Sequence, residues 1–371
     1  MTGPVLRLLA DDLTGALDTA AELTGLCGPV PVGWDGADHS AGGSLALDSG
    51  TREASRAVAT ARVRALAPAL RGADIAFKKI DSLLRGQVAA ELATCIESGA
   101  WPHVVLAPAF PAQGRITRGG AVLVRQPDGR FSGIAPDLPG LLAAEGLLAR
   151  PGDPSAPLQP GLSVFDAAHD ADLARIVARG RGTAGPVLWC GSGGLARALA
   201  GSTTAGASTA LRGPVLGLFG SDQPATARQL AACGDRAIAV AAGDGPTAAR
   251  IARMMDTAGV AMVSVALPDG LDRAAAALRI AAVMAGLTRH LPQPGTLIVA
   301  GGETLRAICD ALGARGLEAT GIVAPGVPRS VMRGGAWDGA PIVSKSGAFG
   351  GDTLWRDLLA DTVLPSGSIH A

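Results

Sequence analysis

Residues 4–26, PVLRLLADDLTGALDTAAELTGL, contain a short apolar strand, a polar loop and an Ala- and Leu-rich amphipathic helix, in that order. The same order returns at 74–96 and at 186–200, while the apolar run 103–107 leads into another polar loop. Strands this apolar, alternating with helices, are typical of parallel sheets whose two faces are both covered. The sequence therefore predicts an α/β protein with mainly parallel sheets flanked by helices.

The pattern restarts in the second half of the chain. Apolar runs at 215–219, 296–300 and 342–344 each lead into a glycine-containing loop and then a helix. These runs predict a second sheet of the same kind.

One segment has the composition of a linker: GSTTAGASTALRG at 201–213. A length of 371 residues is also enough for two domains. We therefore predict an N-terminal domain at 1–205 and a C-terminal domain at 212–371. The Pro- and Gly-rich stretch 127–160 is expected to be an irregular excursion of the first domain.

The composition bounds the function classes. Hydrophobic residues make up 48% of the chain and charged residues 17%, which suits large cores and argues against disorder. The net charge is zero, so the sequence has no electrostatic footprint for nucleic acid or an anionic membrane. The five cysteines are scattered and lie mostly in apolar segments, as reduced core residues of a cytosolic protein do. With no signal-peptide pattern and no long apolar span, we expect a soluble, cytoplasmic protein.

Only three lysines occur among the 32 Lys and Arg residues, namely Lys78, Lys79 and Lys345. All three lie in short polar segments at the ends of apolar runs. Lysine is a compact point charge that reaches an anion end-on, whereas arginine is a wide planar fork. We therefore expect these lysines in functional loops, and a solvated surface position is the alternative.

Polar side chains gather in the loops that follow the predicted strands of the first domain. In open α/β sheets, ligands bind beyond the carboxyl ends of the strands. The candidates there are Asp11, Asp12, Lys78, Lys79, Asp81, Ser82, Arg85, Gln113 and Arg115, with Asp48, Ser49 and Arg52 as additional candidates. Cations would hold a carboxylate and aspartates would accept hydrogen bonds from hydroxyls, which suits a small polyhydroxy acid. An aspartate there could also accept a proton from an attacking hydroxyl.

Structural alternatives exist for several of these candidates. Asp11, Asp12 and Ser82 could be helix caps or turn residues, and Arg85 and Arg115 could form surface ion pairs.

The loops of the second domain are rich in glycine. They are Gly220-Ser221, Gly301–Thr304 and the run from Lys345 to Asp352. Glycine at a strand-to-helix turn lets phosphate oxygens approach backbone N–H groups, and the helix N-terminus favours an anion. Three such loops in one half predict a phosphate-binding site, and tight turns without a ligand are the alternative.

Several standard signatures are absent from the sequence. It has no G-x-x-x-x-G-K-[ST] and no G-x-G-x-x-G after the first strand, which excludes a P-loop and weakens a dinucleotide site. C-x-x-C and H-E-x-x-H are also missing and the histidines are isolated, so no protein-held transition metal is expected. Without G-x-S-x-G, a serine hydrolase has little support.

Six motifs of the chain resemble, in the same order, those of the four-carbon acid sugar kinase family. They are ADDLTGALDTA (10–20), KKIDSLLRGQVAAEL (78–92), APAFPAQGRITRGG (107–120), GGETLRAI (301–308), PGVP (325–328) and SKSGAFG (344–350). The resemblance covers nearly the whole chain. It implies a sugar-acid-binding domain followed by a nucleotide-binding domain, with the active site in the cleft between them. It also implies an enzyme that uses ATP with Mg²⁺ to phosphorylate the 4-hydroxyl of D-threonate, D-erythronate, a 3-oxo-tetronate or a related acid. A homodimer is compatible with the apolar content.

The nucleotide-binding motifs of the family carry over to three loops. The types GSCS, GGET and KSGNFG match residues 220–221, 301–304 and 345–350, and Ala348 stands in place of the family's asparagine. The resemblance implies nucleotide contacts from Ser221, Gly301, Gly302, Glu303, Thr304, Lys345, Ser346, Gly347 and Gly350. It also leads us to expect that Lys345 stabilises charge on the phosphoryl group, and that Mg²⁺ is held mainly by phosphates and waters.

The substrate motifs DDLTG and KxDSTLRG match residues 11–15 and 79–86, with Leu83 in place of threonine. That departure makes a changed substrate an open alternative. The implied acid-binding residues are Asp11, Asp12, Lys78, Lys79, Ser82, Arg85, Gln113 and Arg115. Asp12 and Asp81 are both candidates for the proton acceptor, and the sequence does not choose between them.

Two other functions stay open from the sequence. One is a nicotinamide-dependent oxidoreductase acting on similar acids, with GSGG at 191–194 as its phosphate loop. The other is a non-catalytic sugar-acid sensor that has kept the two-domain shape.

Overall fold

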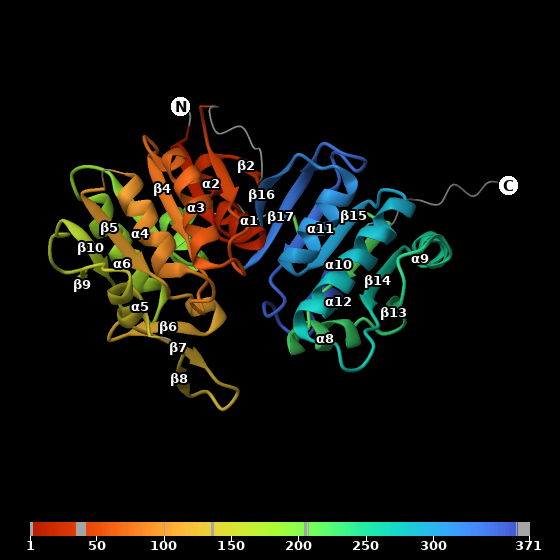
Figure 1. The fold of residues 1–371 in the computed structure, drawn as a ribbon. Helices are drawn as coiled ribbons and strands as arrows, with labels where there is room; N and C mark the ends of the chain where they lie inside the picture. Colours follow the sequence, from red (N-terminus) through yellow and green to blue (C-terminus); the bar gives the residue numbers. More distant parts are fainter. Residues whose placement is uncertain are drawn as a thin grey trace. The chain divides into compact units, whose positions relative to one another are not determined.

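The computed structural model describes residues 3–34, 42–99, 101–134, 137–203, 206, 208–360 and 362. The chain divides into two compact units, Met1–Ala205 (unit 1) and Gly206–Ala371 (unit 2). Each unit contains a mainly parallel set of strands flanked by helices (Figure 1). The predicted α/β fold class is confirmed.

The parallel strands of unit 1 carry most of its sequence motifs. They are β1 (Leu6–Ala10), β2 (Val30–Gly33), β3 (Leu45–Asp48), β4 (Ile75–Lys79), β5 (His103–Ala107), β9 (Ala149–Pro151), β10 (Gly161–Val164) and β11 (Val187–Gly191). Their order is β2-β3-β1-β4-β11-β5-β10-β9, and all neighbours in this order are parallel. β4 and β5 are buried along their whole length, as expected for strands covered on both faces.

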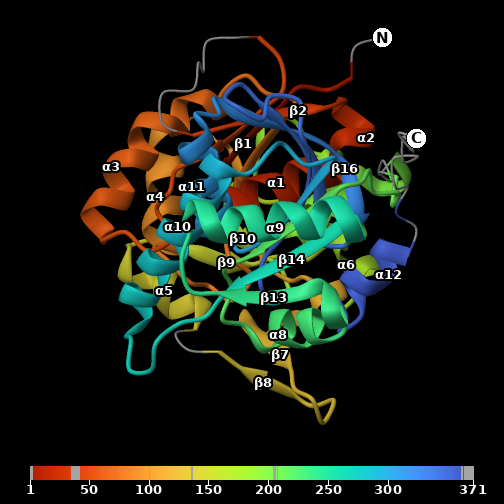
Figure 2. The same cartoon turned by 90° about the vertical axis from the view of Figure 1, so that its right-hand side faces the viewer.

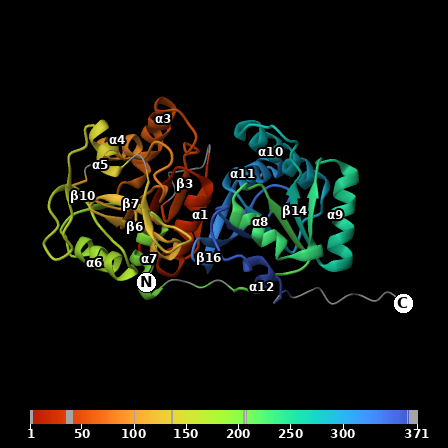
Figure 3. The same cartoon turned by 90° about the horizontal axis from the view of Figure 1, so that it is seen from below.

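Helices cover both faces of these strands. They are α1 (Leu13–Glu22), α2 (Thr24–Cys27), α3 (Arg56–Leu66), α4 (Val88–Ser98), α5 (Leu138–Ala144), α6 (Asp170–Arg181) and α7 (Gly193–Ala200). α3 packs on α4, whereas α7 packs on α1 and α6. Figure 3 shows α3 and α4 on one side of the strands and α6 and α7 on the other. Leu9, Val63, Leu92 and Leu106 belong to the apolar core beneath α3 and α4. This apolar packing leaves the loops at the ends of the strands as the place where most polar motif residues lie.

The stretch 127–160 is more regular than expected. It contains β8 (Phe131–Gly133), α5 and β9. β8 forms a small antiparallel sheet with β6 (Arg115–Arg118) and β7 (Ala121–Arg125). β6 starts just after the short 3₁₀ helix η2 (Pro111–Gln113).

Unit 2 combines parallel strands with an antiparallel edge. Its strands are β12 (Val215–Phe219), β13 (Ala237–Val240), β14 (Val260–Val265), β15 (Thr296–Ala300), β16 (Gly316–Ala324), β17 (Val327–Arg333) and β18 (Pro341–Lys345). In the order β13-β14-β12-β15-β18 all neighbours are parallel. β17 then pairs antiparallel with both β18 and β16, which the sequence analysis did not predict.

The helices of unit 2 lie between these strands in the chain. They are α8 (Pro224–Ala231), α9 (Gly245–Ala258), α10 (Arg273–His290), α11 (Gly302–Leu312) and α12 (Leu354–Ala360). α9 packs on β14 and lies beside α10, which in turn packs on α11 (Figure 2). Within the described ranges of the chain, no helix combines the length and the apolar character needed to cross a membrane.

Candidate functional site

The loops after β1, β3 and β4 meet at one end of the unit 1 strands, because β1 pairs in register with both of the others. Thr51 and Arg52 donate their backbone N–H groups to the carbonyl of Asp11 at 2.9 and 3.0 Å, which joins the loops after β3 and β1. The side chains gathered here are named the unit 1 cluster: Asp11, Asp12, Arg52, Lys79, Asp81, Ser82, Arg85 and Arg115.

Arg52 is the centre of the unit 1 cluster. Its Nη2 atom donates to Asp11 Oδ1 at 2.7 Å and to Asp12 Oδ1 at 2.9 Å, while its Nε atom donates to Asp11 Oδ2. Its Nη1 atom lies 3.4 Å from Asp81 Oδ1. Burial alone would raise the pKa of Asp11, but the charge and hydrogen bonds of Arg52 lower it below its usual value. One largely buried guanidinium thus gathers three carboxylates.

Asp81 is fixed inside its own loop. Its Oδ2 atom accepts from Arg85 Nε at 2.9 Å and from the backbone N–H groups of Leu83 and Arg85 at 3.2 Å. Its Oδ1 atom accepts from Arg85 Nη2 at 2.9 Å. Burial would raise the pKa of Asp81, but the hydrogen bonds from Arg85 and the charge of Arg52 hold it well below its usual range. Such a carboxylate is a weak base, and its bonds order a loop in which Leu84 has a φ of 57°.

Asp12 is the most accessible of the three carboxylates. Its side chain is 24% exposed, against 3% for Asp11 and 7% for Asp81. It caps α1, since Oδ1 accepts from the Gly15 N–H at 2.9 Å and Oδ2 accepts from Thr14 Oγ1 at 2.7 Å. Asp12 is therefore a helix cap, as the structural alternative expected, and its side chain is still accessible to a ligand.

The two adjacent lysines differ in their surroundings. Lys78 is fully buried, and its Nζ atom lies 2.7 Å from Glu91 Oε2 on α4. Burial would lower the pKa of Lys78, but the charge of Glu91 outweighs it and the pKa is raised. The Nζ atom of Lys79 lies 3.9 Å from Asp18 Oδ1, beside the first turn of α1, where a Cβ on Gly15 would come within 3.0 Å of it. Lys79 thus lies next to Asp12 and its cap, while Lys78 points into the core.

A buried hydrogen-bond chain links Lys78 to the loop that carries Arg52. Thr51 Oγ1 donates to the Lys78 partner Glu91 at 2.6 Å, and the hydroxyls of Thr51 and Ser49 lie 2.8 Å apart. The sequence analysis missed Glu91 and Thr51. An acidic residue in the otherwise apolar helix after β4 was the signal for Glu91.

Ser82 and Arg115 lie together beside the Asp81 loop. Arg115 is buried at the start of β6, and its Nη1 atom donates to Ser82 Oγ. Burial lowers the pKa of Arg115 from its ordinary value. Gln113, half-buried at the end of η2, precedes Arg115 by two residues.

In unit 2, three loops lie side by side at the carboxyl ends of β12, β15 and β18, and we name them the unit 2 loops: residues 220–221, 301–304 and 345–351. The register aligns Phe219 with Ala300, and Ala300 with Lys345. The Gly220 N–H donates to the carbonyl of Ala300, and the Gly301 N–H to that of Lys345, each at 3.1 Å. The structure therefore brings the predicted nucleotide residues into one row.

Close backbone approach explains two of the glycines in these loops. A Cβ on Gly220 would lie 1.9 Å from Thr304 Oγ1, and a Cβ on Gly347 would lie 1.7 Å from Ser221 Oγ. Gly301, the N-cap of α11, has a φ of +114° that favours glycine. Thr304 is buried by this packing. The remaining predicted residues are more open: Gly302 and Ser346 are half-buried, and Glu303 and Gly350 are exposed.

Lys345 points into the protein. It is fully buried, and its Nζ atom donates to Gly347 O at 2.9 Å, Ser346 O at 3.2 Å and Thr226 Oγ1 at 3.4 Å. Nζ also lies 6.0 Å from the centroid of the Trp355 ring. Burial lowers the pKa of Lys345 to about 7.

The sequence analysis missed the side chains that hold this loop, Thr226 and Gln229 on α8 and Trp355 on α12. Spacing gives only a weak signal, because Thr226 and Gln229 stand three residues apart and so share a helix face.

Two family models match the chain, one within each unit. A model described as a sugar-binding N-terminal domain matches residues 6–137, and one described as a nucleotide-binding C-terminal domain matches residues 216–354. Proteins named D-threonate kinase are similar over nearly the whole chain. The one from Bordetella bronchiseptica is 32% identical, covering 94% of this chain and 95% of its own. The one from Cupriavidus necator is 34% identical, covering 94% and 96%.

The chain belongs to the four-carbon acid sugar kinase family. It is therefore an ATP-dependent kinase of this sugar-acid class. The two alternatives left open by the sequence, a nicotinamide-dependent oxidoreductase and a non-catalytic sensor, do not agree with this family. Two solved structures share the fold. A Salmonella typhimurium LT2 protein has a TM-score of 0.71 and 20% identity, covering 94% of this chain and 97% of that chain. A Haemophilus influenzae protein has a TM-score of 0.64 and 17% identity, covering 95% and 99%.

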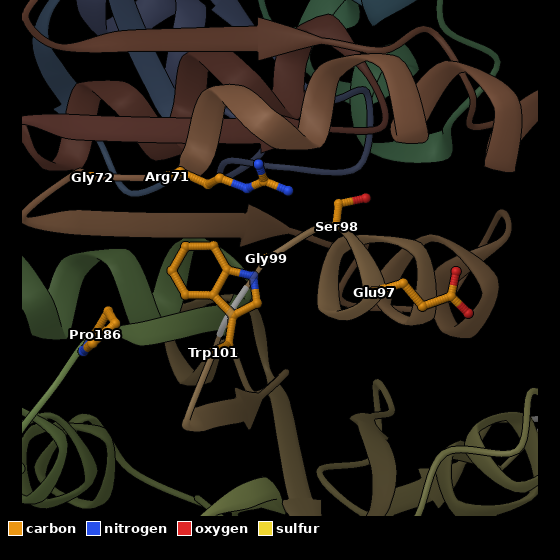
Figure 4. A pocket seen from close by; sticks show the side chains of 7 residues that line it. All are labelled: Arg71, Gly72, Glu97, Ser98, Gly99, Trp101 and Pro186. Carbon is orange, nitrogen blue, oxygen red and sulfur yellow. The ribbon is translucent and has the colours of Figure 1, made fainter.

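A pocket of about 550 Å³ lies away from both sites of this family member. Its lining residues are Arg71, Gly72, Glu97, Ser98, Gly99, Trp101 and Pro186, with the Trp101 ring between Pro186 and the end of α4 (Figure 4). Arg71, Trp101 and Pro186 come just before β4, β5 and β11, so the pocket is at the amino ends of the strands. It is thus at the opposite end of the unit 1 strands from the unit 1 cluster.

The described residues contain no group of three or more His, Cys, Asp or Glu side chains arranged to hold a metal ion. The unit 1 carboxylates are already engaged by Arg52 and Arg85. Such surroundings fit Mg²⁺ that arrives bound to a nucleotide, since this ion keeps several waters and binds phosphate oxygens.

Proposed function

We propose that this kinase transfers the γ-phosphoryl group of ATP to the 4-hydroxyl of a four-carbon sugar acid, with D-threonate as the first candidate. The observation that carries the proposal is the pairing of two unlike sites in one chain. Unit 1 has a charged cluster suited to a hydroxylated acid, and unit 2 has three glycine-containing loops suited to phosphates. The similarity to two proteins named D-threonate kinase supports the choice of acid.

The acid would bind at the unit 1 cluster. Arg85, Arg115 and Lys79 are the cations expected to bind its carboxylate. Arg85 is the most exposed of them, whereas Lys78 is fully buried and paired with Glu91. Ser82 and Asp12 would bind hydroxyl groups. Asp11 and Lys78 would support the site from behind, through Arg52 and Glu91 respectively, in place of the direct contacts expected from the sequence.

Asp12 is the better proton acceptor of the two candidates. Asp81 receives four hydrogen bonds within its loop and its pKa is held well below the usual range. Asp12 is more exposed and has a less crowded Oδ2 atom, which accepts only from Thr14 among the described residues. A loose transition state demands little of the base, so position matters more than basicity.

ATP would lie over the unit 2 loops. Gly220 and Gly347 let these loops pack tightly, with the Thr304 and Ser221 hydroxyls against them. Glycine-containing strand-to-helix turns of this kind offer backbone N–H groups to phosphates. MgATP supplies the phosphoryl group and its counter-ion. The residues of this chain would bind, align and shield it. Transfer requires the bound acid and the bound nucleotide to meet. A cleft between the two domains stays a prediction, and so does a homodimer.

The test is ADP release from MgATP with D- and L-threonate, D- and L-erythronate and 3-oxo-tetronates. The panel is broad because Leu83 departs from the family pattern. Turnover of D-threonate is expected, with loss of at least about 100-fold in kcat for Asp12→Asn and a smaller loss for Asp81→Asn. Acid binding without ADP release from any of these acids would contradict the proposal.

A further inference from the structure

Lys345 buries an amine that no carboxylate pairs with among the residues that the structure describes. An ammonium group has three N–H donors, and the three oxygens around Nζ account for all of them. Two of these oxygens are carbonyls of the loop that directly follows Lys345, at Ser346 and Gly347. No donor is left to reach a phosphate in this geometry.

Two side chains of α8 hold the same loop by its carbonyl groups. Thr226 Oγ1 donates to Gly347 O at 2.9 Å, so this hydroxyl can accept from Lys345 while it donates to the loop. Gln229 Nε2 donates to the carbonyls of residues 349–351 at 3.0, 3.2 and 3.0 Å. For the N–H groups of Gly347 and Ala348, by contrast, the described part of the chain offers no hydrogen-bond acceptor.

We propose that Lys345 is a positioning residue that, with Thr226, holds the carbonyls of Ser346 and Gly347 inward and so turns the N–H groups of this loop toward the nucleotide phosphates. The inference rests on the proposed function, in which ATP lies over the unit 2 loops. It replaces the expectation that Lys345 itself touches the phosphoryl group. Lys345 then determines nucleotide affinity and leaves the chemical step largely unchanged.

The surroundings of Lys345 make this role dependent on pH. Burial lowers its pKa to about 7, and no charged group among the described residues offsets this effect. Charged side chains on the neighbouring helices pair elsewhere: Arg228 on α8 lies 2.8 Å from Asp352, which follows the loop, and Arg356 on α12 lies 2.9 Å from Asp357. β15 carries no titratable side chain. A neutral amine has two N–H groups, so one of the three oxygens loses its donor when Lys345 deprotonates.

The test measures ATP affinity by titration calorimetry. It also measures kcat and the KM for ATP, with an acid that the kinase phosphorylates as the second substrate. Lys345→Met should raise the ATP Kd and KM by about tenfold or more, because charged hydrogen bonds are lost. Thr226→Val should raise both by about fivefold. In both variants kcat at saturating ATP should stay within about threefold of wild type. Arg253→Gln, an exposed change on α9, is the matched control and should alter neither quantity.

A pH series gives a readout that a general loss of structure would not produce. Between pH 7 and 9 the ATP Kd of wild type and Arg253→Gln should rise, while that of Lys345→Met should stay flat. Bound phosphate favours the charged amine, so the midpoint in the complex should lie above that of the free protein.

Three results would overturn the inference. They are a drop of about 100-fold or more in kcat for Lys345→Met with unchanged ATP Kd, an unaltered ATP Kd in Thr226→Val, or a flat wild-type pH series. If Lys345→Met does not fold, Thr226→Val and the wild-type series decide the question. Failure of wild-type protein to bind ATP would instead refute the proposed function, so the two failures are distinguishable.

Discussion

Units 1 and 2 each bury a lysine near the carboxyl end of a parallel strand, but they surround it differently. Lys78 on β4 lies 2.7 Å from Glu91, and its pKa is raised. Lys345 on β18 meets neutral oxygens, and its pKa is lowered to about 7. A buried amine paired with a carboxylate stays charged over the usual pH range, whereas one held only by neutral oxygens loses its charge more readily as pH rises.

The unit 1 cluster and the unit 2 loops differ in the same way, in charged partners against neutral groups. The unit 1 cluster consists of carboxylates and guanidinium groups that fix one another, as a ligand with a charge and several hydroxyls requires. The unit 2 loops present mainly backbone, which suits phosphates that bring their own charge and metal ion. Variants in each unit can break or sharpen this comparison.

The largest expected effect is on stability, from Lys78→Met. This change leaves Glu91 buried without its cation, which typically costs about 3–5 kcal/mol. Combining it with Glu91→Met should recover at least half of that loss, because no charge is then left behind. Lys345→Met leaves no carboxylate unpaired and should cost only about 1–2 kcal/mol. Urea denaturation measures all three, and equal losses for the two single lysine variants would contradict the comparison.

Arg52→Ala should have the next largest effect, on use of the acid. Truncating one partner of a buried charge pair costs about 2–5 kcal/mol, so kcat/KM for the acid should fall by about 100-fold. ATP affinity should not change, because the unit 2 loops are intact. Arg52→Lys should restore only part of the activity, since lysine cannot hold Asp11 through two nitrogens. Arg64→Gln, an exposed change on α3, is the control, and full activity in Arg52→Ala would show that the carboxylates need no shared cation.

Glu22 on α1 is a third kind of buried charge. Its two carboxylate oxygens find no hydrogen-bond donor among the described residues, and burial raises its pKa to about 7. A carboxyl pKa that is higher in the folded state makes the unfolding free energy greatest below pH 4.5 and lower as pH rises toward 7. Wild type should thus lose about 2 kcal/mol between pH 5 and 8 that Glu22→Gln does not lose. Chemical denaturation between pH 5 and 8 measures this loss, with the exposed Glu53→Gln as control. If the free energy of unfolding of Glu22→Gln and wild type changes with pH in the same way, the prediction is refuted.

The smallest expected effect comes from Thr51→Val. The loss of its hydroxyl takes one hydrogen bond from Glu91 and loosens the loop that carries Arg52. Stability should fall by about 1 kcal/mol, and the KM for the acid should rise modestly. Thr257→Val, an exposed change on α9, should leave both unchanged. A KM that rises without any loss of stability would mean that Thr51 acts on the site alone.

The strand-end positions of the site residues could be predicted from sequence because they depend on neighbours in the chain. Asp11, Asp81 and Lys345 each follow or end an apolar run, and a parallel sheet brings such ends together. The partners could not be predicted in this way. Alternation along a strand puts Lys78 and Lys79 on opposite faces, but only the topology determines that α4 brings Glu91 to Lys78.

The antiparallel edge of unit 2 was missed although it has a local signal. Pro325 and Gly326 stand between β16 and β17, and a Pro-Gly pair between two strand-like runs is typical of a hairpin. The hold of Thr226 and Gln229 on the last loop has no comparable signal. Those contacts join residues more than 100 positions apart, as in the bond from Thr226 to Gly347 with a separation of 121.

The last of the unit 2 loops also offers an attachment point for a reporter. The side chain of Ala348 is exposed, whereas its neighbours Gly347 and Phe349 are buried. Four of the five natural cysteines are buried as well, so a cysteine introduced at 348 would be the most reachable thiol apart from half-buried Cys27. A fluorophore attached there would sit beside the expected phosphates without entering the packing of the loop. One of the positions at which this chain departs from its family is thus a place where a chemist could build a nucleotide sensor.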